Sequence, residues 1–148
     1  MGLGWRLAAL GIGLMSVVSL RADLKRAQAE SNLEKRSQLA MDNAAAAYQA
    51  ARAAYDKGDN EQAARSSAEI QESVDLAYAS LTQTHKDPRR SPKWFKKAEI
   101  ATRDLLRKLD SFQQVMSFTD RTMLDNVRAR VQKVHDDLLL GLMEGKHK

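Results

Sequence analysis

Three histidines are the side chains of this sequence best suited to bind a metal or to move a proton: His85, His135 and His147. No two of them lie three or four residues apart, which is the spacing that places two ligands on one helix face. The repeated Glu-x-x-His pattern of di-iron helical bundles is also missing. Met41 and His135 could in principle hold a haem between two helices, although methionine is equally suited to a core. We therefore expect no metal and no cofactor.

Other kinds of catalytic chemistry have no recognisable motif either. The sequence contains no cysteine, which excludes disulfides, thiolate nucleophiles and cysteine-bound metal clusters. No glycine-rich loop follows a strand-like segment, and no serine lies in the strand-turn-helix setting of a hydrolase nucleophile. These absences favour a protein that is not an enzyme.

The densest group of candidate binding residues is a run of cations at residues 86–97, called the basic corner below. Asp87 is the only acidic residue within it, and Pro88 and Pro92 restrict its backbone. Basic residues beside aromatic ones are typical of surfaces that bind anions. The alternative is a solvated loop whose tryptophan belongs to the core. The candidate binding residues are Arg89, Arg90, Lys93, Trp94, Lys96 and Lys97.

The elements that must position these residues are all predicted to be helices. Glycine and proline are few, with 7 and 2 residues, and no alternating run of β-branched residues indicates a strand. Apolar side chains recur every three or four residues in four segments, as in amphipathic helices. We expect an all-α, four-helix up-down bundle of two antiparallel hairpins with coiled-coil-like packing. The predicted helices span residues 23–57, 60–84, 92–116 and 120–143.

Local signals at the predicted helix ends support this division. Gly58 is expected to end the first helix in a left-handed conformation. Asp59 is expected to cap the second helix, with Gln62 as its reciprocal capping-box partner. Ser91 and Asp120 are expected to cap the third and fourth helices.

The four helices differ in the side chains that they can bury. The third and fourth carry leucine and valine stripes, and we expect Leu105 and Leu138 to be fully buried. The first offers mainly alanine over residues 44–54, which buries little apolar area. We therefore expect either that the first helix is the least firmly held or that its alanine face serves another chain.

The segment Ala54–Ala63 resembles the turn of a tetratricopeptide repeat, in which a glycine and an acidic residue separate two helices. Gly58 and Ala63 match the small residues of that turn. Ser67 stands where the family has a large residue, and neither the tryptophan, leucine and glycine of the first repeat helix nor a second copy is present. The resemblance implies a helical hairpin and carries over no binding residue.

The first 22 residues have the pattern of a secretory signal peptide. Arg6 precedes an uncharged run from Leu7 to Leu20, and Ala22 provides a small residue for cleavage. The run is shorter than the roughly 20 residues of a spanning helix, so a retained inner-membrane anchor is the alternative. We expect a mature domain of residues 23–148 in the periplasm or outside the cell.

Charge and composition leave two functional hypotheses. A net charge of +5 gives no indication of nucleic-acid binding. The first hypothesis is a non-catalytic exported bundle that contacts an unknown protein partner or itself. The second is a peripheral module that binds an anionic membrane or envelope polymer through the basic corner.

Overall fold

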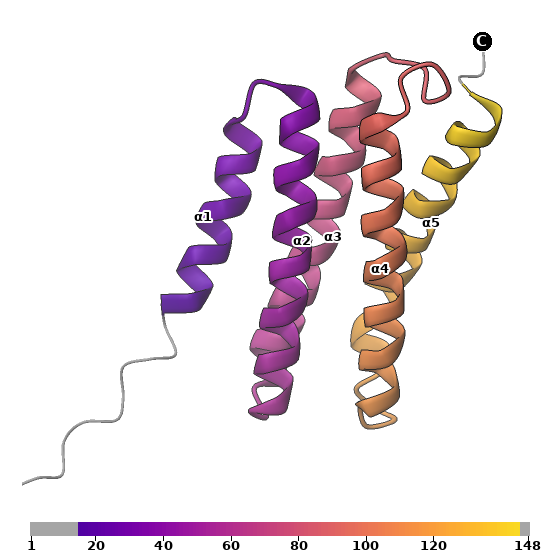
Figure 1. Ribbon diagram of the computed structural model, residues 1–148. Helices are drawn as coiled ribbons and strands as arrows, with labels where there is room; N and C mark the ends of the chain where they lie inside the picture. The colour runs from indigo at the N-terminus through magenta and orange to yellow at the C-terminus, as the bar shows by residue number, and fades with distance from the viewer. Residues whose placement is uncertain (1–14, 146–148) are drawn as a thin grey trace, which may run out of the picture.

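The computed structural model describes residues 15–145, and all regular secondary structure within this range is helical (Figure 1). The all-α prediction is therefore confirmed. The five helices are α1 (Met15–Ala29), α2 (Leu33–Asp56), α3 (Asn60–Gln83), α4 (Lys93–Val115) and α5 (Thr122–Glu144).

Consecutive helices run in opposite directions, as Figure 1 shows. Helix α2 packs against α3 and α4, while α5 packs against α4 and α3. Helix α1 packs against α2, on the side of α2 that faces away from α4. The α1–α2 turn, the α3–α4 loop and the end of α5 therefore lie at one end of the molecule, and the α2–α3 and α4–α5 turns lie at the other.

The helix expected over residues 23–57 is in fact two helices. The chain turns at residues 30–32, where the Asn32 side chain accepts a hydrogen bond from the Lys35 amide at 2.9 Å and so caps α2. The Glu30 side chain accepts one from the Asn32 amide at 3.1 Å. Because α1 folds back along α2, Leu24 and Ala27 are buried rather than projecting beyond the core.

The hydrophobic core combines residues from all five helices. Leu105 of α4 and Leu138 of α5 are buried, as predicted. Phe112 of α4 is also buried and meets Tyr48 and Tyr55 of α2 edge-on, with ring centroids 6.0 and 5.6 Å apart. Aromatic contacts of this kind add to the stabilisation from buried apolar area.

The alanine face of α2 is covered within the chain. Ala47 and Ala51 are completely buried, and α3 faces α2 with small buried residues such as Ser66 and Ser73. Small side chains on both helices let the backbones approach closely. The Asn43 amide nitrogen donates to the Ser73 hydroxyl at 2.8 Å across this contact. The expectation that this face serves another chain is therefore wrong.

Helix termini confirm some of the predicted signals and correct others. Gly58 adopts a φ of 77°, and the Asp59 side chain accepts from the Gln62 amide at 3.0 Å, as expected. The reciprocal half of the capping box is absent, because the Asp59 amide donates to the Ala54 carbonyl and Gln62 Oε1 accepts from Arg65 instead. The resemblance of this turn to a tetratricopeptide repeat stays a prediction.

The two later helices begin without the predicted side-chain caps. Neither Ser91 nor Asp120 caps its helix. Asp120 instead accepts a hydrogen bond from the Tyr55 hydroxyl at 3.1 Å, and the same hydroxyl accepts from the Ser117 amide at 2.9 Å. The tyrosine of α2 thus fastens the α4–α5 turn by a contact between residues far apart in sequence.

The N-terminal prediction falls largely on residues 1–14, which lie outside the described residues. Ala22, the expected cleavage position, lies within α1. Between residues 15 and 145, no helix has the length and apolar character that crossing a membrane requires.

Candidate binding surface at the α3–α4 loop

The loop between α3 and α4 is shaped by short-range hydrogen bonds to Asp87. Its carboxylate accepts from the Arg89 amide at 2.9 Å, and its carbonyl accepts from the Arg90 and Ser91 amides at 3.1 and 2.8 Å. The Asp87 carbonyl is therefore the acceptor for the Ser91 amide, while the Ser91 side chain makes no capping hydrogen bond at the start of α4. The two arginines are consequently held on an ordered backbone.

The loop is docked on the last turns of α5. A β-carbon on Gly141 would lie only 3.2 Å from Cγ of Pro88, and one on Gly145 would lie 3.0 Å from Cδ of Arg89. The absence of side chains at these glycines allows the loop to approach the helix closely. The start of α4, the loop and the end of α5 therefore form one continuous surface.

Five of the predicted site residues are cations, and all five are exposed to solvent: Arg89, Arg90, Lys93, Lys96 and Lys97. Within residues 15–145, none of them forms an ion pair. The sixth cation of the basic corner, Lys86, is paired with Glu34 at the start of α2. No other nine-residue stretch of the described chain has as many cations outside ion pairs.

Trp94 differs from the cations because it is half-buried and packs against the core. The ammonium groups of Lys93 and Lys97 lie 5.0 and 4.5 Å from the centroid of its ring. Cations over an aromatic face are attracted by the ring quadrupole. Trp94 thus supports two lysines of the surface while its own ring belongs partly to the helix packing.

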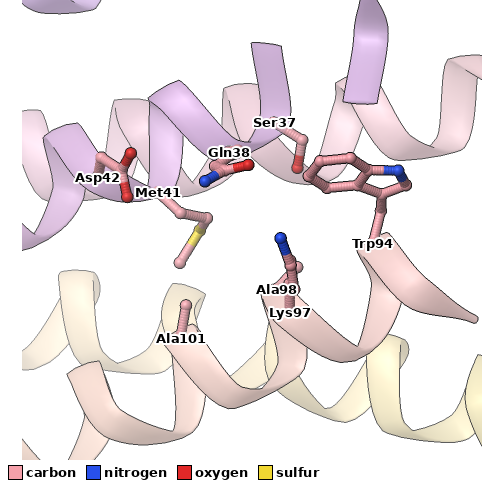
Figure 2. A pocket seen from close by; sticks show the side chains of 8 residues that line it. All are labelled: Ser37, Gln38, Met41, Asp42, Trp94, Lys97, Ala98 and Ala101. Carbon is pink, nitrogen blue, oxygen red and sulfur yellow. The ribbon is translucent and has the colours of Figure 1, made fainter. Parts of the chain in front are cut away.

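An open pocket of about 230 Å³ lies beside Trp94 between α2 and α4 (Figure 2). Its walls include Met41 of α2 and Ala101 of α4. Partial desolvation raises the pKa of the Asp42 carboxyl, and the Lys97 ammonium nearby opposes that rise. The pocket has one cation and one anion on its rim, and it offers no set of groups arranged for catalysis.

The histidines do not come together in a site. His135 Nε2 lies 3.0 Å from Glu99 Oε1, in a contact between α5 and α4 where both side chains are almost covered. Arg103 also reaches Glu99, at 3.5 Å. Glu99 is thus buried between two cationic or titratable side chains, although Glu and Arg at a four-residue spacing usually form a solvated pair on a helix surface.

The remaining metal and haem hypotheses find no geometric support. Met41 lines the pocket between α2 and α4, whereas His135 faces Glu99 on the other side of α4. His85 follows α3 with a φ of 56°, and His147 lies outside the described residues. Across residues 15–145, no group of three or more histidine, cysteine or acidic side chains is placed to hold a metal ion.

Comparison with known proteins does not assign this sequence to a family. The sequence matches no protein-family model, and no functionally characterised protein shows significant similarity to it. Any functional conclusion therefore rests on the surface just described.

Proposed function

We propose that this chain is a non-catalytic helical-bundle protein that binds an anionic surface through the basic corner. The observation that carries the proposal is the group of five exposed cations on residues 89–97, none of which forms an ion pair with another described residue. Like charges at such density repel one another, and an anionic partner relieves that repulsion. The backbone bonds to Asp87 hold the arginines ready for contact, which lowers the entropy lost on binding.

The contrast with other cations of the bundle supports this choice. Most cations on the helix surfaces have acidic partners, such as Arg65 with Glu61 and Lys133 with Asp137, both at 2.9 Å. Pairs of this kind neutralise a helix surface and contribute little else. The five cations at residues 89–97 form no such pair within the described residues and therefore keep their positive potential for a partner.

The scaffold in this proposal is an up-down bundle whose four antiparallel helices are α2 to α5, with α1 added against α2. Alternating helix directions and the shared core support that description. In this proposal the bundle serves to position the α3–α4 loop, because it holds the loop on rigid helices.

A second candidate function, contact with another protein or with a second copy of the chain, is favoured by the opposite end of the bundle. Phe118 in the α4–α5 turn is 85% exposed, and Val115 beside it is also exposed. The hydrogen bonds of Tyr55 hold this turn in place. An ordered turn that presents an exposed aromatic side chain is suited to a protein partner.

The anionic-surface proposal predicts the effect of reversing charges in the loop. Arg89→Glu/Arg90→Glu/Lys93→Glu is expected to lower binding to anionic vesicles or to a soluble acidic polymer at least tenfold, because three attractions become repulsions. Binding of the unaltered protein should weaken as salt rises, since the cations are exposed and screened. Vesicle co-sedimentation and polymer titration at low and moderate salt measure both effects.

A matched control reverses cations that already have partners. Arg65→Glu/Arg107→Glu/Lys133→Glu changes the net charge by the same amount, at positions outside the basic corner. This control should retain binding. If the control weakens binding as much as the loop variant does, binding depends on the net charge of the protein and not on the position of the basic corner. Absence of binding by the unaltered protein at low salt would leave the protein-contact function in its place.

The proposal also places the protein outside the cytoplasm, with its mature chain beginning at Asp23. Cleavage after Ala22 would leave residues 23–29 of α1, and these include the buried Leu24 and Ala27. N-terminal sequencing of the native protein should therefore begin at or near Asp23. An intact Met1 in the membrane fraction would mean a retained anchor, and an intact Met1 in the cytoplasm would contradict export.

A further inference from the structure

Exposed apolar side chains gather next to the basic corner. Leu139, Leu140 and Met143 lie on the outer side of the last turns of α5, and Met143 is 68% exposed. Ile100 is exposed on the first half of α4. Single exposed apolar residues are ordinary on protein surfaces, but a contiguous group indicates an interaction site.

The register between α4 and α5 places this group beside the cations. The contact of His135 with Glu99 fixes the two antiparallel helices relative to each other. One turn nearer the loop, Leu139 follows His135 on α5 while Lys96 precedes Glu99 on α4. Leu139 and Lys96 therefore lie at similar heights along the antiparallel pair of α4 and α5.

The apolar residues at the end of α5 share one side of that helix. Leu139 and Met143 are four residues apart, and Leu140 and Met143 are three apart, so the three share one side of the helix. Gly141 and Gly145 lie on the other side of α5, two residues from Met143, and there they contact Pro88 and Arg89 of the loop. The apolar group therefore adjoins the basic corner through Lys96 of α4, and the two together are called the docking face below.

The chemistry of the docking face distinguishes between possible anionic partners. A soluble acidic polymer is bound by the cations alone and gains nothing from Met143 or the leucines. A lipid bilayer offers phosphates at its surface and apolar chains just beneath, and lysine stems extend along that boundary with their charges in the headgroup layer. Two exposed acidic residues, Asp136 one turn before Leu140 and Glu144 one turn after it, limit the apolar group along α5.

We propose that the docking face binds an anionic lipid bilayer, with the basic corner on the headgroup phosphates and Leu139, Leu140 and Met143 inserted among the upper acyl chains. This inference rests on the proposed function and specifies its ligand. The attraction between charges weakens as salt rises, whereas burial of the three apolar side chains contributes a binding free energy that does not depend on salt.

A single-cysteine probe tests the insertion, because the chain contains no cysteine of its own. Protein with its native N-terminus carries an environment-sensitive fluorophore at Met143→Cys, and a matched sample carries it at Phe118→Cys on the opposite end. With vesicles of mixed anionic and zwitterionic lipid, the emission of the label at position 143 should shift to the blue, and that of the label at 118 should stay unchanged. Dextran sulfate, a soluble polyanion, should shift neither.

Removal of the apolar side chains gives a second measurement. Leu139→Ser/Leu140→Ser/Met143→Ser should lower the partition coefficient on anionic vesicles about tenfold and leave dextran sulfate binding unchanged. Circular dichroism verifies that the variant keeps its fold, which is expected because all three side chains are exposed.

The outcomes separate this inference from the proposed function. If the protein sediments with vesicles but the label at position 143 does not move, the contact is electrostatic only; the lipid inference fails while the proposed function stands. If both labels shift, the docking face is not the contact and the inference fails. If the unaltered protein binds neither vesicles nor polymer at low salt, both fail together.

Discussion

Replacement of Phe112 by alanine is expected to lower the free energy of unfolding by about 3–5 kcal/mol. The ring is completely buried and touches two tyrosine rings of α2. The Arg52 guanidinium also lies over it, 5.3 Å from the ring centroid. Truncation would remove these contacts and leave a cavity between α2 and α4, where the surrounding helices cannot collapse fully. Urea unfolding followed by circular dichroism measures the change.

Phe118→Ala is the matched control for this prediction. Phe118 lies six residues further along the chain, and its ring is 85% exposed. Its removal should change the free energy of unfolding by less than about 0.5 kcal/mol, as for most surface substitutions. Equal losses in the two variants would mean that Phe118 is covered in solution, as it would be in a self-associated form.

The sequence predicted the last three helices well because their signals are local. Apolar stripes with a period of three to four residues marked α3, α4 and α5 to within two residues at each end. The break before α2 was missed because Glu30 and Asn32 lie in a polar stretch where the stripe is weak. The hydrogen bond from the Lys35 amide to the Asn32 side chain identifies Asn32 as a cap in the structure. Turn-forming residues are weak signals when the spacing of the apolar residues does not change around them.

Only those charges of the candidate surface that lie close together in the sequence could be predicted. The run of cations at residues 86–97 can be identified directly from the sequence. The pairing of Lys86 with Glu34 and of His135 with Glu99 could not be predicted, since those partners are 52 and 36 residues apart. The same limit applies to Leu139 and Met143, because only the register of α5 against α4 places them beside the loop. Contacts of this kind depend on tertiary packing and leave no spacing pattern.

The neighbouring residues Leu138 and Leu139 provide a test that separates stability from binding. Leu138 is 2% exposed and belongs to the core, whereas Leu139 is 40% exposed and belongs to the docking face. Leu138→Ala is expected to lower the free energy of unfolding by about 2–5 kcal/mol, because it leaves a cavity among packed side chains. Leu139→Ala should change it by less than about 0.5 kcal/mol.

Binding to anionic vesicles should respond in the opposite order. Leu139→Ala is expected to weaken the partition about threefold, because less apolar area enters the bilayer. Leu138→Ala should leave the partition unchanged under conditions where the variant remains folded, since its side chain does not reach the surface. Thermal unfolding and vesicle co-sedimentation of the two variants measure both quantities. Equal effects on vesicle binding would show that the partition follows stability, and the side of α5 that carries Leu139 would then have no direct contact with lipid.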